Sequence, residues 1–94
     1  MNNNIKTYKL IIIGKVQGVG FRYWFNKEAI ALNLKGYVRN LENENEVESI
    51  IQGSANNISH FIEKCKHGPK LAMVEKIISK NINDYKVCTN FKIQ

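Results

Sequence analysis

Apolar residues recur along the chain with two different periods, and each change of period predicts a change between strand and helix. Residues 5–13 (IKTYKLIII) are rich in β-branched and aromatic side chains and end in an unbroken apolar run, which is typical of a central strand. Residues 21–33 (FRYWFNKEAIALN) are predicted to form a helix, with Asn33 as a tolerable left-handed end, because they carry one apolar stripe at helical spacing. Its members, at steps of four, four and three residues, are Phe21, Phe25, Ala29 and Leu32. The glycine-rich residues 14–20 are predicted to form the loop between the two segments.

The middle of the chain predicts a hairpin. Residues 34–41 (LKGYVRNL) and 46–53 (EVESIIQG) have the composition of strands, and the polar residues 42–45 (ENEN) join them as a turn, because asparagine tolerates positive φ angles. Four glutamates alternate around this turn, namely Glu42, Glu44, Glu46 and Glu48. Alternate residues on a twisted ribbon need not converge, so we interpret them as a solvated hairpin tip and not as a metal site.

The last part of the chain predicts a second helix and two more strands. Ser54 is placed to cap a helix over residues 55–66, where an i, i+3, i+4, i+7 pattern is formed by Ile58, Phe61, Ile62 and Cys65. The Gly-Pro pair at 68–69 ends this helix. Residues 71–82 are predicted as a long strand and residues 89–93 as a short final strand.

The order of the predicted elements specifies a fold class. Strand, helix, strand, strand, helix and strand, followed by a short C-terminal strand, form an α/β (α+β) two-layer sandwich in which two helices cover one face of a mainly antiparallel sheet. The split βαβ topology follows because each crossover connection must be right-handed. Residues 1–94 have the length of one domain, with residues 1–4 predicted to be frayed.

Composition adds little to this picture. The net charge is +6, but the lysines are scattered and do not form a nucleic-acid-binding cluster. No apolar run is long enough to span a membrane, and the polar N-terminus is not a secretory signal, so a cytoplasmic location is expected.

Cys65 and Cys88 match no zinc pattern. We interpret them as reduced thiols, although the sequence leaves a disulfide between them open.

The loop at 14–20 and the residues after it have the features of an anion site. A glycine-rich loop that opens a helix offers unpaired N–H groups and the positive end of the helix dipole, and Gly18 and Gly20 are placed to turn successive N–H groups inward. The loop is neither a Walker A nor a dinucleotide-binding sequence. Arg22 strengthens the hypothesis, because the chain has 12 lysines and only 2 arginines, and only arginine grips two phosphate oxygens at once.

The second arginine lies in a strand beside an asparagine. Because neighbouring residues of a strand point to opposite faces, only one of Arg39 and Asn40 can share a site with Arg22. We favour Asn40, because its amide both donates and accepts hydrogen bonds and is able to hold a water molecule. Arg39 is expected to support the sheet surface or to meet acidic neighbours.

The glycine-rich loop, Arg22 and the strand that holds Asn40 also resemble sequence stretches of a known family. GKVQGVGFR at 14–22 and GYVRNL at 36–41 resemble the two signature stretches of the acylphosphatase family, and GPKLAMVEKI at 68–77 and the closing FKI are similar to further stretches of it. The resemblance implies a ferredoxin-like fold and metal-independent hydrolysis of acyl phosphates to carboxylate and inorganic phosphate, without a cofactor. It implies that Arg22 binds the phosphate and that Asn40 positions the attacking water. The implied phosphate cradle is Val16, Gln17, Gly18, Val19, Gly20, Phe21 and Arg22.

The chemistry of an acyl phosphate fits this small set of groups. The leaving carboxylate is a weak base and departs without a general acid, and the loose phosphoryl transition state needs mainly positioning and charge stabilisation. The two signature stretches contain no base, so a phosphate oxygen is predicted to accept the proton of the water. His60 and His67 are interpreted as structural or surface residues.

Three alternatives remain open at this point. The chain resembles the carbamoyl-phosphate-handling domain of hydrogenase-maturation carbamoyltransferases, and it has the element order of an RNA-binding module, although Val38 and Arg39 break that module's signature. A protein that binds an anion without turnover is the third. We expect a small-molecule acyl phosphate as the partner, no nucleic acid or membrane, and a monomer. The identity of the acyl group is not encoded in these motifs.

Overall fold

The computed structural model describes residues 5–94, so the predicted fraying of residues 1–4 lies outside the described residues. The strands and helices follow in the predicted order. They are β1 (Ile5–Lys15), α1 (Phe21–Ala31), β2 (Lys35–Asn40), β3 (Glu46–Ser54), α2 (Ala55–Cys65), β4 (Met73–Asn81) and β5 (Phe91–Ile93).

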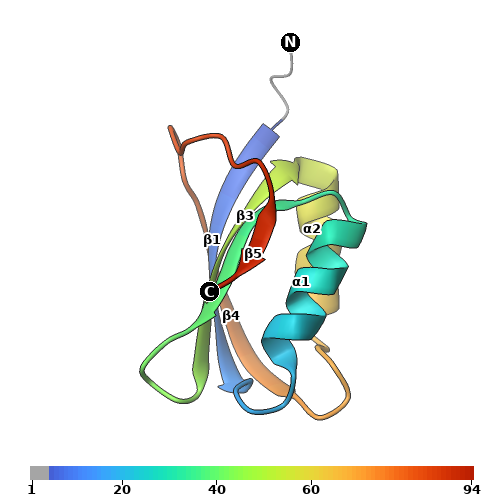
Figure 1. Ribbon diagram of the computed structural model, residues 1–94, viewed down its shortest axis with the longest axis vertical. Coiled ribbons are helices and arrows are strands. Elements are labelled where there is room, and N and C mark those ends of the chain that lie inside the picture. The colour runs from blue at the N-terminus through green and yellow to red at the C-terminus, as the bar shows by residue number, and fades with distance from the viewer. Residues whose placement is uncertain (1–4) are drawn as a thin grey trace.

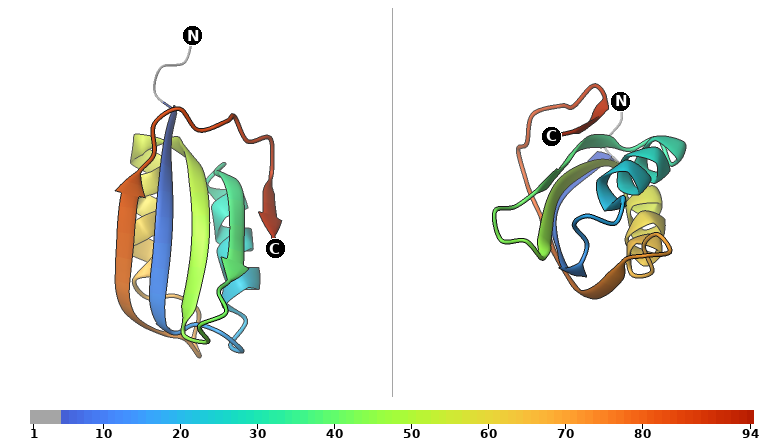
Figure 2. Two further views of the ribbon diagram at one scale, coloured as in Figure 1. Left: turned by 90° about the vertical axis from the view of Figure 1, so that its left-hand side faces the viewer. Right: turned by 60° about the horizontal axis from the view of Figure 1, so that its bottom comes forward.

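The strands form one sheet, seen nearly edge-on in Figure 1, in the order β4-β1-β3-β2-β5, which the left view of Figure 2 shows. Every neighbouring pair is antiparallel except β2 and β5, which are parallel. Both helices pack on the same face of the sheet (Figure 1). The predicted two-layer α+β sandwich with a mainly antiparallel sheet is therefore confirmed. Within the described residues, neither helix is long and apolar enough to cross a membrane.

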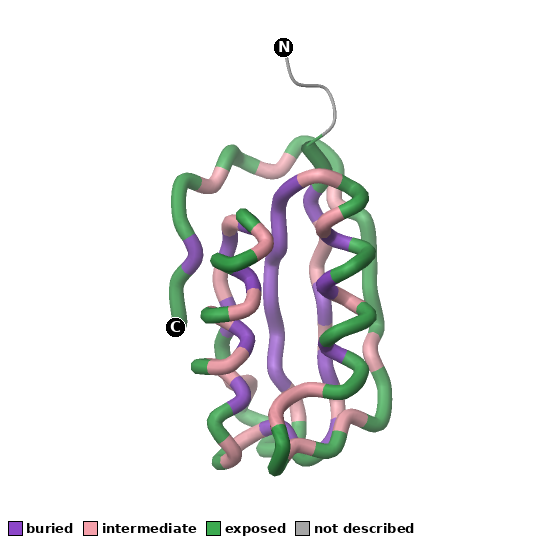
Figure 3. The backbone as a smooth tube through the Cα atoms, turned by 90° about the vertical axis from the view of Figure 1, so that its right-hand side faces the viewer, coloured by how far each residue is buried: buried purple, intermediate pink, exposed green. Residues whose placement is uncertain are grey.

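The core lies between the helices and the sheet, as Figure 3 shows by the purple segments that face each other. Leu10 and Ile12 of β1 are fully buried, because alternate residues of a central strand point to the helix-covered face. The apolar stripes of both helices meet them, and the rings of Phe25 and Phe61 contact each other edge to face with their centroids 4.8 Å apart. The helical periodicity of the sequence is thus matched by the buried face of each helix.

Two predicted features of the helix ends are confirmed. Ser54 caps α2, because its Oγ accepts a hydrogen bond from the N–H of Asn57 at 3.1 Å. Asn33 follows α1 with a φ angle of 59°, so an asparagine supplies the left-handed residue that often follows a helix. The helix itself ends at Ala31, two residues before the predicted limit.

The last two strands are shorter than predicted. The turn after α2 continues to Ala72, whose N–H donates to the carbonyl of Pro69 at 3.0 Å, and β4 therefore starts at Met73 instead of residue 71. The irregular segment before β5 is held by Gln52, which donates to the carbonyl of Lys86 at 2.9 Å and accepts from the N–H of Cys88 at 2.7 Å.

Both cysteines, Cys65 and Cys88, are free thiols, so the disulfide that the sequence left open is not formed.

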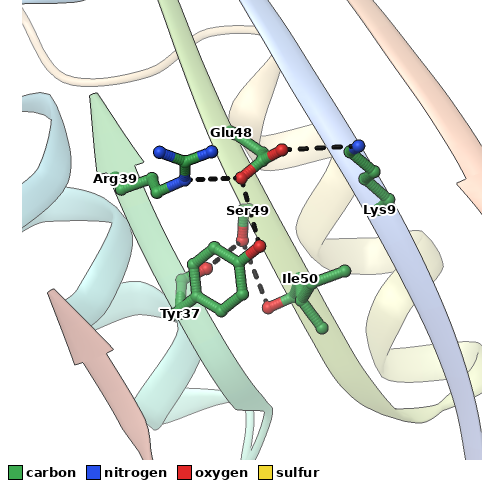
Figure 4. A network of polar contacts seen from close by, with 6 residues as sticks. All are labelled: Lys9, Tyr37, Arg39, Glu48, Ser49 and Ile50. Carbon is green, nitrogen blue, oxygen red and sulfur yellow. Dashed lines mark hydrogen bonds and ion pairs between the residues drawn. The ribbon is translucent and has the colours of Figure 1, made fainter. Parts of the chain in front are cut away.

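Glu48 departs from the predicted solvated hairpin tip. Its carboxylate lies on the open face of the sheet, where it accepts from Arg39 Nε at 2.7 Å and from the Tyr37 hydroxyl at 3.1 Å, with Lys9 Nζ at 3.4 Å (Figure 4). Only 10% of the side chain is exposed. The interpretation as a solvated tip was wrong for Glu48 because this residue lies inside β3, where β1 and β2 flank it on both sides.

The network shifts two pKa values in opposite directions. Burial, reinforced by the negative charge of Glu48, raises the pKa of Tyr37 to about 12. Burial on its own would also raise the pKa of Glu48, but the hydrogen bonds from Arg39 and Tyr37 and the nearby cationic charge outweigh it and hold that pKa below its ordinary value of 4.5. The carboxylate therefore stabilises the folded protein in its charged form.

We predict that Glu48→Gln lowers the free energy of unfolding by roughly 1 kcal/mol at pH 7, because it removes the charge from a hydrogen-bonded, largely buried group. Since the folded pKa is depressed, the Glu48 contribution is present above pH 4.5 and is lost as the pH falls through the folded value. Urea denaturation between pH 3 and pH 7 should therefore show a weaker pH dependence in the variant.

The control is Glu63→Gln. Glu63 pairs with Lys66 at 2.7 Å on the surface of α2, and its side chain is 68% exposed. An equal loss of stability in both variants at pH 7 would contradict a special role for the Glu48 network.

Candidate active site

At two positions of the loop between β1 and α1, the backbone has a conformation that only glycine adopts without strain. Gly18 has a φ angle of 73° and Gly20 a φ angle of 76°, both in the left-handed region. A Cβ atom added to either glycine would meet no atom within 4 Å. The glycines are therefore required by the conformation of the loop, and the space beside them is open to a ligand.

This conformation leaves a series of main-chain donors without partners. Gly20 is the N-cap of α1 and has no side chain to cap the helix, and the first main-chain bond of the helix runs from Trp24 N–H to the Gly20 carbonyl. Within the described part of the chain, the N–H groups of residues 18–23 donate no hydrogen bond to another protein group. No acidic residue occupies the first turn. The end of the helix is thus a concentration of positive potential that no acidic residue of its own first turn offsets.

Arg22 is fixed over this helix end by the far end of the chain. Its Nη1 donates to the main-chain oxygen of Gln94 at 2.9 Å, just after β5. The remaining N–H groups of the guanidinium form no hydrogen bond with other described residues. One contact orients the planar group while its other donors stay available for an anion.

Asn40 is the last residue of β2, the first strand of the hairpin, and it lines the site from there. Residues of β2 alternate, so Val38 and Asn40 face the helices while Arg39 points to the opposite face and pairs with Glu48. The prediction that Arg39 and Asn40 diverge, with Arg39 meeting an acidic neighbour, is confirmed. Asn40 Oδ1 is buried and has no hydrogen-bond partner among the described residues, which is unusual for a buried amide oxygen.

A hollow of about 230 Å³ brings these groups together. Five of the predicted cradle residues and Asn40 line it, so groups from the loop, the helix and β2 converge. Two lining residues were not predicted, Tyr23 and Ile93. Ile93 belongs there because β5 pairs with β2 at Val38, a parallel pairing that no local sequence pattern indicates. The complete lining is Val16, Gly18, Gly20, Phe21, Arg22, Tyr23, Asn40 and Ile93.

Gln17 and Val19, the other two predicted cradle residues, do not line the hollow. The side chain of Gln17 points away from the helix end and donates from Nε2 to the carbonyls of Leu41 and Glu46, both at 2.9 Å. The side chain thus contacts the β2–β3 hairpin, and any contribution of Gln17 to an anion must come from its main chain.

Comparison with known proteins decides the family. The model of the acylphosphatase family matches residues 8–93. The chain belongs to the acylphosphatase family. A relative from Vibrio parahaemolyticus named acylphosphatase is 39% identical over 90 residues, which are 96% of this chain and 98% of the relative. The resemblance predicted from the signature stretches is therefore confirmed, and so is the acid-anhydride hydrolase activity that the family name describes.

Solved structures agree with this assignment. An acylphosphatase from Coxiella burnetii superposes with a TM-score of 0.92 at 30% identity, and all of both chains is covered. The acylphosphatase from Bacillus subtilis gives a TM-score of 0.90 at 32% identity over 95% of this chain and 98% of that chain. The ferredoxin-like fold implied by the resemblance is confirmed.

The acylphosphatase loop gives a prediction about stability. Gly20→Ala should lower the free energy of unfolding by only about 1 kcal/mol, because the left-handed conformation is strained but the new Cβ meets no atom. Gly36→Ala is the contrasting variant, since its Cβ would overlap the carbonyl oxygen of Ile50 in the neighbouring strand. Urea denaturation should show a several-fold larger loss for Gly36→Ala, and equal losses would contradict the analysis.

Proposed function

We propose that this acylphosphatase holds the phosphoryl group of its substrate with the main-chain amides of residues 16–22 and with Arg22, and that Asn40 positions the attacking water. One observation carries the proposal: the unpaired loop amides, the oriented guanidinium and the unpartnered oxygen of Asn40 line a single hollow. The reaction is metal-independent hydrolysis of the carboxyl–phosphate bond to carboxylate and inorganic phosphate.

The donors match the charge that develops on the phosphoryl group. In the loose transition state, charge is spread over three equatorial oxygens. N–H groups at a helix N-terminus point at these oxygens without reorganising, and a guanidinium binds two of them in one plane. The Nη1 of Arg22 already donates a hydrogen bond to Gln94. The phosphoryl group therefore approaches the edge of the guanidinium whose N–H groups are still available.

Asn40 supplies an acceptor where all the other groups are donors. A water molecule that attacks phosphorus must direct an oxygen lone pair at it and a hydrogen away from it. The buried Oδ1 of Asn40 lacks a donor, and a water O–H satisfies it in the required direction. This removes the energetic penalty of the unpaired oxygen and orients the nucleophile in one contact.

No described side chain in the hollow is a base that takes the proton of the water. His60 and His67 are both exposed on or beside α2 and do not line the hollow. A phosphate oxygen of the substrate therefore accepts the proton, and the carboxylate leaves unprotonated because it is a weak base.

The same proposal treats residues 1–94 as one monomeric domain that acts in the cytoplasm on a small acyl phosphate, without a cofactor and without binding nucleic acid. The free thiols of Cys65 and Cys88 favour a reducing compartment. Benzoyl, acetyl and carbamoyl phosphate carry the same reacting centre, and their relative turnover distinguishes a general acylphosphatase from a carbamoyl-phosphate-handling domain.

We predict that Arg22→Lys and Asn40→Ala each lower kcat/KM for benzoyl phosphate by roughly 10²–10³-fold. The affinity for inorganic phosphate should fall in Arg22→Lys, because lysine replaces a planar fork by a point charge, and should be retained in Asn40→Ala. Arg39→Lys is the matched control, since Arg39 lies next to Asn40 but points to the opposite face. A loss of phosphate affinity in Asn40→Ala alone would reverse the assigned roles.

We further predict that the pH–rate profile of kcat/KM shows no ionisation of an essential enzyme base between pH 6 and pH 8, because the proton goes to the substrate. Steady-state hydrolysis of benzoyl phosphate measures the profile. His60→Gln and His67→Gln should leave it unchanged. A fall in wild-type activity on the acid side of this range that disappears in one of the two variants would identify that histidine as the base.

A further inference from the structure

The phosphate loop and the β2–β3 hairpin lie at the same end of the sheet (Figure 1), and one side chain joins them. Nε2 of Gln17 lies 2.9 Å from the carbonyl oxygens of Leu41 and Glu46 and 3.2 Å from that of Asn43. An amide nitrogen carries two protons, so the two shorter contacts are full hydrogen bonds and the third is shared. The three acceptors surround the point where β2 turns into the hairpin.

This point controls the position of Asn40. Leu41 directly follows Asn40, and its N–H donates to the carbonyl of Glu46 at 3.1 Å, which closes the neck of the hairpin. Gln17 donates to the carbonyls of both residues of this closing pair. A second contact, from the N–H of Gly14 to the carbonyl of Asn45 at 3.0 Å, joins the start of the loop to the same hairpin.

We propose that Gln17 is a positioning residue: through its side chain it sets the distance and orientation between Asn40 and the loop that holds the phosphoryl group. The inference rests on the proposed function. It assigns to the side chain of Gln17 a role different from that of a phosphate ligand, because its donor group is already used by three carbonyl oxygens of the β2–β3 hairpin.

The proposal separates two steps of the reaction. The phosphoryl group is held by loop amides and Arg22, which belong to the loop and to α1, whereas the water is held by a residue of β2. When the link between loop and hairpin is lost, phosphate binding persists but water and phosphorus no longer meet in the right geometry. A misplacement of about 1 Å is enough to lower a rate by up to roughly 10²-fold.

The experiment compares two glutamines whose side chains each link separate segments of the chain by three hydrogen-bond contacts. Gln17→Met keeps the length of the side chain without adding charge, and it should lower kcat for benzoyl phosphate by roughly tenfold or more while KM and the dissociation constant of inorganic phosphate change by less than about threefold. Gln52→Met is the matched control. It removes hydrogen bonds to Thr7, Lys86 and Cys88 at the other end of the sheet, so it should lose stability and keep kcat.

A double variant tests whether Gln17 acts through Asn40. In an Asn40→Ala background, Gln17→Met should change kcat by less than about twofold, because there is no water-holding amide left to misplace. A full tenfold loss in that background, or an equal loss of kcat in Gln17→Met and Gln52→Met, would overturn the proposal.

A readout without turnover keeps this test independent of the proposed function. The side-chain amide signal of Asn40 in a ¹⁵N–¹H NMR spectrum should shift or broaden in Gln17→Met and stay unchanged in Gln52→Met. An unchanged signal in Gln17→Met would overturn the positioning role even if the wild-type protein hydrolyses benzoyl phosphate. An absence of turnover in the wild type, with the signal perturbed as expected, would overturn the proposed mechanism alone.

Discussion

Main-chain N–H groups that have no partner among the described residues are the constraint around which this end of the molecule is built. Residues 18–23 present such groups because Gly18 and Gly20 take left-handed conformations and because the helix that follows starts without a side-chain cap. A helix end without a capping side chain or an acidic residue contributes less to stability than a capped one. The buried aromatic and aliphatic core between the helices and the sheet supplies the stability that allows this arrangement. The same groups that add little to the stability of the fold are favourable for binding a phosphoryl group.

The alternation of β2 explains how one strand serves both stability and chemistry. Tyr37 and Arg39 point to the open face, where they join Glu48 in a satisfied polar network. Asn40 points to the other face and keeps an unpartnered oxygen. Because the two sets of side chains lie on opposite faces, hydrogen bonds that fix β2 in the sheet do not compete for the amide of Asn40.

The sequence predicted what depends on short-range periodicity and local chemistry. Both helices, the cap at Ser54, the left-handed Asn33 and the convergence of Arg22 with Asn40 follow from spacing or from residue type. The sequence did not predict the side-chain contact of Gln17 or the burial of Glu48. Each of these depends on which strands become neighbours, and that is settled by the packing of the whole sheet. The lining residue Ile93 was missed for the same reason, since its place follows from the parallel pairing of β5 with β2.

The chemistry of an acyl phosphate makes placement more important than reactivity. A carboxylate leaves without protonation, and the loose transition state makes little demand on the strength of the nucleophile. A site without a base, a nucleophilic side chain or a general acid therefore suffices, provided that its few groups are held at the correct distances and orientations. The groups in this hollow come from a loop, a helix and two strands, and polar contacts near the site join these elements: Gln94 to Arg22, Gly14 to Asn45 and Gln17 to the hairpin. In such a site, a residue that does not touch the substrate is also expected to influence the rate, because it fixes the distance between two groups that do.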